Sequence, residues 1–107
     1  MMELDNLNAM VRGWFVGDFE PNVVKTKDFE VGIKTYKAGD YEEEHFHKIG
    51  TEITVILDGE ARMKGSVYKH GDIITIPPME STDFEALTDV KTVVVKIPSA
   101  RNDKFIV

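Results

Sequence analysis

A short stretch between Gly39 and Gly59 constrains this chain more than any other, because it places two histidines and a glutamate close together. His45 and His47 are separated by one residue, so on an extended strand both side chains project from the same face. Residues 48–51 are typical of a turn, after which Glu52 opens a returning strand. Two imidazoles and a carboxylate then converge from one face. The pattern predicts a metal site with His45, His47 and Glu52 as ligands.

Length and composition limit what the rest of the chain can be. A chain of 107 residues predicts a single domain, 1–107, with one hydrophobic core. It has no cysteine, which excludes disulfides and thiolate metal sites and fits a reducing, cytoplasmic location. The net charge of −6 argues against nucleic acid as a partner. No apolar run approaches the ~20 residues of a membrane span, and no secretory signal is visible, so we expect no membrane partner.

The chain is patterned as strands almost throughout, which predicts an all-β fold. Residues 1–11 are a weakly patterned lead-in, either a short helix or a mobile segment, and Met10 is a possible second start. Residues 29–36 alternate apolar and polar side chains, as a half-buried strand does. Asp58-Gly59 is typical of a tight hairpin. Further strands are expected at 61–64, 67–69, 73–76, 82–87 and 90–97. Short strands with turn signals every 8–12 residues indicate a sandwich or barrel.

The histidine stretch resembles a motif of the cupin superfamily. Its spacing is Gly39, five residues, His45, one residue, His47, four residues, Glu52, six residues, Gly59, and it matches the first cupin motif, 39–59, at every position. A second motif begins at Gly71 and Pro77, but over 71–86 its glycine, histidine and asparagine fall on Met79, Thr82 and Ala86. The resemblance implies a single-domain jelly-roll β-barrel with the metal held in its mouth.

Cupins of this kind usually hold their metal with three histidines and one glutamate, and here the third histidine is replaced by Thr82. Water can complete the coordination of the remaining triad, or the site can be weak or empty. A bulge that turns Asp83 inward is a third, disfavoured alternative, because alternation puts Thr82 and Phe84 on the face opposite Asp83. Imidazole and carboxylate ligands suit Zn, Fe, Ni, Mn and Co alike, so the identity of the metal stays open.

Two functions follow from the resemblance. The first is a metal-dependent enzyme acting on a small polar metabolite, with oxygenase or isomerase chemistry. The second is a non-catalytic module that binds a small ligand, such as a sugar derivative, or has a structural role. Tyr36 and Thr82 are the candidate ligand-binding residues, and Arg62 reaches an anionic ligand only if it faces inward. No acid–base pair stands out beyond the metal ligands, so no catalytic residue is assigned.

A small barrel leaves strand edges exposed, and small cupins often pair across a two-fold axis. We therefore expect a homodimer. The apolar segments Trp14–Val16 and Phe105–Val107 are the expected contacts.

Overall fold

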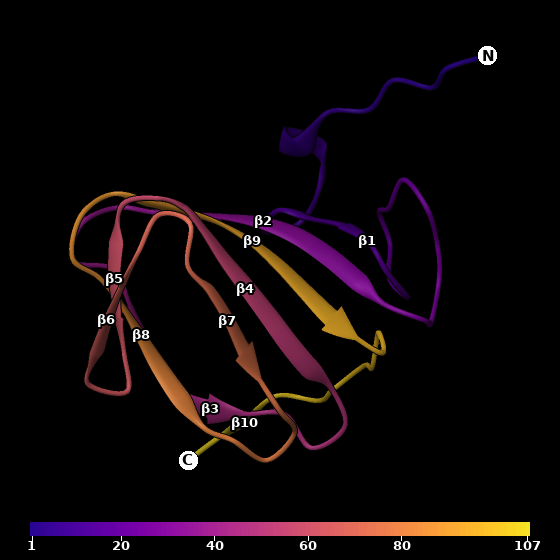
Figure 1. The fold of residues 1–107 in the computed structure, drawn as a ribbon. Coiled ribbons are helices and arrows are strands. Elements are labelled where there is room, and N and C mark those ends of the chain that lie inside the picture. Colours follow the sequence, from indigo (N-terminus) through magenta and orange to yellow (C-terminus); the bar gives the residue numbers. More distant parts are fainter.

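The computed structural model describes residues 1–107 and consists of two five-stranded antiparallel sheets (Figure 1). The first sheet has the order β1 (Trp14–Val16), β2 (Glu30–Tyr36), β9 (Val90–Ile97), β4 (Thr51–Asp58) and β7 (Ile73–Ile76). The second has the order β10 (Phe105–Ile106), β3 (Tyr41–Phe46), β8 (Thr82–Ala86), β5 (Glu60–Met63) and β6 (Ser66–Lys69). The only helical element is one 3-10 turn, η1 (Leu7–Ala9). The predicted all-β fold is confirmed.

The chain changes sheet at each end of β4. The β3–β4 loop leads from the second sheet to the first, and Asp58-Gly59 leads back to β5. The prediction of a hairpin at Asp58-Gly59 is therefore wrong. Both edges of β4 are already occupied, by β9 and β7, so β5 has no edge of β4 to pair with. Gly59 still needs to be a glycine, because its φ is 88° and a Cβ would lie 2.1 Å from the carbonyl oxygen of Asp89.

The space between the sheets is apolar in one part and polar in another. The apolar cluster contains side chains from both sheets: Ile56, Ala61, Met63, Ile76, Phe84, Ala86 and Val90. Burial of such side chains contributes ~1.5–3 kcal/mol for each large one. Elsewhere on the inner face of the first sheet, several side chains that lie in register across neighbouring strands are polar. Glu30, Lys96 and Glu52 lie in register across three strands, and Lys34 lies beside Thr92. Most of these polar side chains line a cavity between the sheets.

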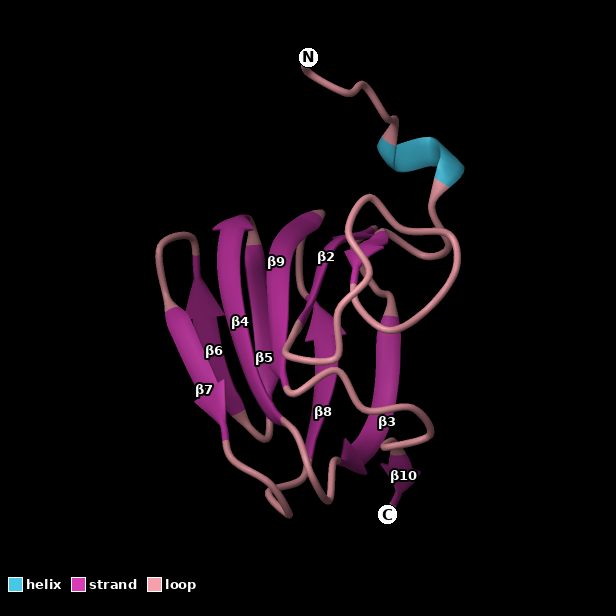
Figure 2. Cartoon of the chain, turned by 90° about the vertical axis from the view of Figure 1, so that its right-hand side faces the viewer, coloured by secondary structure: helices cyan, strands magenta, loops and turns pink.

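The two ends of the chain differ in how they attach. Residues 1–9 are exposed, η1 buries no side chain, and the N-terminal segment runs away from the sheets (Figure 2). At the other end β10 pairs with β3, and the Phe105 ring stacks on that of Phe46 with centroids 5.5 Å apart. Trp14 likewise packs inside its own chain, over Gly32. Trp14 and Phe105, two of the three aromatic residues in the segments expected at a dimer contact, thus have partners within the chain.

No helix in the structure has the length and apolar character needed to cross a membrane.

Candidate metal centre

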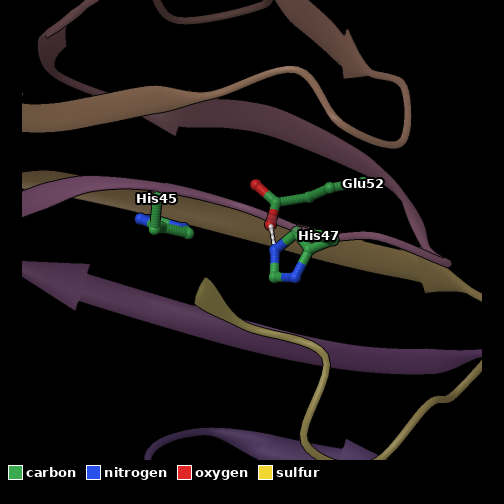
Figure 3. Close-up of side chains that lie close together, drawn as sticks. All are labelled: His45, His47 and Glu52. Atoms are coloured by element: carbon green, nitrogen blue, oxygen red, sulfur yellow. Dashed lines mark ion pairs between the residues drawn. The ribbon is translucent and has the colours of Figure 1, made fainter. Parts of the chain in front are cut away.

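The β3–β4 loop brings His45, His47 and Glu52 together from two facing sheets. His45 lies near the end of β3, His47 follows it in the loop, and Glu52 is the second residue of β4. One possible ligand atom from each residue lies within 4.8 Å of those of the other two. The His47 ring and the Glu52 carboxylate point toward each other, with His45 to one side (Figure 3). The group could hold a metal ion, although the residues meet across the two sheets rather than on neighbouring strands.

His47 is the most buried member of the group, with 6% of its surface exposed. Its Nδ1–H donates to the main-chain carbonyl of Asp103, which leaves Nε2 as the nitrogen with a lone pair. Nε2 lies 3.3 Å from Glu52 Oε1, is buried and has no hydrogen-bond partner. A lone pair and a carboxylate repel each other unless a proton or a metal ion lies between them. A buried imidazole nitrogen that faces a carboxylate, on a ring oriented by a hydrogen bond from its other nitrogen, is a typical environment for a metal ligand.

The other two residues also present suitable atoms. The Nδ1–H of His45 donates a hydrogen bond of 2.8 Å to the carbonyl of Glu43, so Nε2 is the nitrogen that remains free to bind a metal ion. Glu52 accepts a hydrogen bond of 2.9 Å from the hydroxyl of Thr54. Burial raises the pKa of Glu52, but a hydrogen bond from His47 when its Nε2 is protonated, the charge of Lys96 and the Thr54 hydroxyl together lower it below its usual value. Glu52 therefore stays a carboxylate, the form that binds a cation.

Asp103 fixes the loop that carries His47. Its carboxylate accepts hydrogen bonds from three successive backbone N–H groups, those of Lys48 at 2.9 Å, Ile49 at 3.1 Å and Gly50 at 2.9 Å. The same residue's carbonyl binds His47. Burial raises the pKa of Asp103, yet the three N–H groups lower it below its ordinary value. One residue of the C-terminal segment thus determines both the shape of the loop and the orientation of a candidate ligand.

Thr82 lies where the resemblance implies a third histidine. It is the residue of β8 paired with His45, and its hydroxyl donates to the Asp83 carbonyl at 2.8 Å. Asp83 does not join the three candidate ligands. Its carboxylate accepts from the backbone N–H of Lys64 at 2.7 Å and from the hydroxyl of Tyr41 at 3.4 Å. A bulge does occur here, but it is in β3 between Glu42 and His45 and leaves Asp83 with these partners.

A cavity of about 310 Å³ opens beside the group, lined by His45, Glu52, Tyr36 and Thr82 among others. The Tyr36 hydroxyl donates to Glu42 Oε1 at 3.0 Å. Burial, with the Glu42 charge, raises the pKa of Tyr36, so the phenol stays protonated. Arg62 does not face this cavity. It is exposed and pairs with Glu85 at 2.7 Å.

Sequence reasoning missed several residues around the site. Lys34 and Lys96 line the cavity, and Asp103 supports the loop. Lys34 could have been found, because it lies two residues before Tyr36 and period-2 alternation puts both on one face. Nothing in the local sequence connects Asp103 with His47.

The fold is that of the cupins, the double-stranded β-helix. No protein-family model and no curated protein sequence matches the chain. Solved structures do match. A protein with a double-stranded β-helix domain from Klebsiella pneumoniae is 22% identical, with 76% of this chain and 71% of that chain covered and a TM-score of 0.68. A cupin-2 domain protein from Shewanella frigidimarina is 13% identical, with 67% and 72% covered and a TM-score of 0.60.

An enzyme also matches in fold. The DMSP lyase DddQ from Ruegeria pomeroyi is 18% identical, with a TM-score of 0.71. The match covers 85% of this chain but only 48% of the lyase, so the chain spans about half of that protein. At these identities the likeness concerns the fold, and the function has to be argued from the site.

Proposed function

We propose that this chain is a metal-dependent cupin-fold protein that acts on a small polar metabolite, with His45, His47 and Glu52 as the metal ligands. The observation that carries the proposal is the buried Nε2 of His47, which faces a carboxylate and has no hydrogen-bond partner. Two imidazoles and one carboxylate suit Zn, Fe, Ni, Mn or Co. A bound divalent ion of this kind supplies Lewis acidity toward a carbonyl or enolate, and iron adds oxygenase chemistry.

The residues around the site support the proposal by what they do to the ligands and the cavity. The Asp103 carbonyl selects the tautomer of His47 that leaves Nε2 free, and the Glu43 carbonyl does the same for His45. Glu52 is held as a carboxylate. The protonated Tyr36 hydroxyl and its acceptor Glu42 line the same cavity and offer polar contacts to a substrate. The similarity in fold to a lyase is consistent with an enzymatic function, but it does not identify the reaction.

A second function, binding of a small ligand without turnover, is favoured by two observations. Thr82 replaces an expected fourth ligand, and its hydroxyl is directed at the Asp83 carbonyl. Tyr36 and Glu42, which could serve as an acid–base pair in the cavity, are hydrogen-bonded to each other. In this second function the barrel would bind a ligand such as a sugar derivative, with a weak metal site or none.

Incubation of the protein with a panel of small hydroxy, keto and dicarboxylic acids and sugars distinguishes the two functions. The protein is loaded in turn with Fe(II), Mn(II), Ni(II) or Zn(II), and the mixtures are followed by proton NMR. We expect at least one compound to be converted by one metal form, and the conversion to be lost in Glu52→Ala. Saturable binding without conversion under every metal would contradict the enzyme proposal and favour the binding module.

A further inference from the structure

The cavity carries more positive than negative side chains. Four cationic residues line the cavity, Arg12, Lys34, Lys96 and Lys104, in a chain with a net charge of −6. None of the four forms an ion pair within 4 Å, whereas Lys25, Arg62, Lys64 and Arg101 do so elsewhere. The ion pairs of the lysines and arginines thus lie outside the cavity.

The acidic residues of the cavity do not remove this imbalance. They are three, Glu42, Glu52 and Asp83, one fewer than the cations. None of them forms an ion pair with a lysine or arginine: Glu42 accepts from Tyr36, Glu52 from Thr54 and Asp83 from the backbone N–H of Lys64. Lys96 lies in register between Glu30 and Glu52, so its charge is partly balanced. Lys34 has no acidic residue beside it in the register of its sheet, where its neighbour is Thr92.

The cationic wall is built around Trp14. Lys34 Nζ lies 4.5 Å and Lys96 Nζ 5.0 Å from the centre of a Trp14 ring. The indole rests on Gly32, where a Cβ would lie 2.7 Å from it, so only glycine leaves room for the ring. Strands β1, β2 and β9, which carry these residues, lie side by side (Figure 1). The indole therefore lies in contact with both ammonium groups.

Lys34 is a cation held partly out of water. Its side chain is half-buried, and its Nζ donates to the carbonyl of Arg12 at 2.7 Å, a neutral acceptor. Burial lowers the pKa of Lys34 to about 8; the charge of Glu42 opposes this shift, and the charges of Arg12, Lys96 and Lys104 add to it. A partly desolvated ammonium group that forms no ion pair is stabilised when an anion binds beside it.

We propose that this cavity binds a small metabolite bearing a carboxylate or phosphate group, which pairs with Lys34 and Lys96 above Trp14. The cavity volume of about 310 Å³ suits a small molecule rather than a chain segment. This proposal names the substrate class of the proposed function. That the bound anion is a substrate rests on the proposed function, whereas binding of the anion does not. The anion subsite itself uses no metal ligand, so it can be tested apart from the metal centre.

The test titrates metal-free protein with malonate, with inorganic phosphate and with neutral malonamide, and follows the backbone and indole N–H signals by NMR. Metal-free protein prevents chelation of a bound ion by the probe. The variants are Lys34→Met and, as a control, Lys91→Met, which removes an exposed lysine from β9 outside the cavity. Lys34→Met should fold well, because it removes a partly desolvated charge, and a thermal melt checks this.

We expect malonate or phosphate to bind saturably and to shift the Trp14 indole signal, whereas malonamide does not bind. Affinity should fall about tenfold or more in Lys34→Met, the loss expected for one charge-assisted contact, and stay unchanged in Lys91→Met. Tighter binding of malonate identifies a carboxylate ligand, and tighter binding of phosphate a phosphate ligand. The proposal is overturned if neither anion saturates, or if folded Lys34→Met binds as tightly as the parent. Either outcome leaves the metal centre untouched, so the two proposals fail separately.

Discussion

Replacing His47 with alanine is expected to weaken the binding of a divalent metal at least about 100-fold. Loss of a residue that merely supports a ligand typically costs 10–100-fold in metal affinity, so loss of the ligand itself should cost at least the upper end of that range. His47 supplies the buried Nε2 opposite Glu52. Isothermal titration of the metal-free protein with Zn(II) or Ni(II) measures the effect.

His70 provides the matched control for this variant. It is the third and last histidine of the chain, exposed in the turn between β6 and β7, and outside the group of candidate ligands. His70→Ala should bind metal as the parent does. Equal weakening in both variants would show that surface histidines capture the metal, and parent-like binding by His47→Ala would remove His47 from the site.

Replacing Asp103 with alanine is expected to lower the stability of the fold and the metal affinity together. The substitution removes the acceptor of three backbone N–H groups, of which that of Gly50 is buried. Unsatisfied buried donors cost about 1–3 kcal/mol each, and the partly buried ones less, so we expect a loss of roughly 2–4 kcal/mol. Metal affinity should fall about 10–100-fold, because the loop no longer holds the Asp103 carbonyl against His47.

Urea unfolding of the metal-free protein and metal titration of the folded variant measure the two effects separately. Asp103→Asn serves as the graded control, because its side-chain oxygen still accepts from the loop although the charge is gone. Its losses should lie between those of the parent and Asp103→Ala. A variant Asp103→Ala with parental metal affinity would show that the loop positions His47 without the C-terminal segment.

The candidate ligands could be predicted from the sequence because they lie within one short segment. Alternation along β3 and a turn after it are local properties, and they suffice to put His45, His47 and Glu52 near one another. The resemblance also identified Thr82, which the structure places beside His45. The sequence could not show that the β3–β4 loop joins two sheets. A turn pattern predicts where the chain reverses, but it does not determine with which strand the next strand pairs.

The remaining features depend on contacts between distant parts of the chain. Asp103 acts on His47 from 56 residues away, and no periodicity links them. In β2 the alternation correctly separates two faces, but the face with Lys34 and Tyr36 is the one that lines the cavity, where an apolar core would be expected. The hairpin prediction at Asp58-Gly59 failed because β9 and β7 occupy both edges of β4. Which edges are free is a property of the whole sheet.

Metal content of the untagged protein, measured by inductively coupled plasma mass spectrometry, tests the central claim most directly. Protein purified without an affinity tag and without added metal is compared with Glu52→Ala prepared in the same way. We expect close to one equivalent of a transition metal in the parent and a large loss in the variant, and the metal found selects the chemistry to examine. Absence of metal from the parent, even after reconstitution with each of the five candidate ions, would contradict the account.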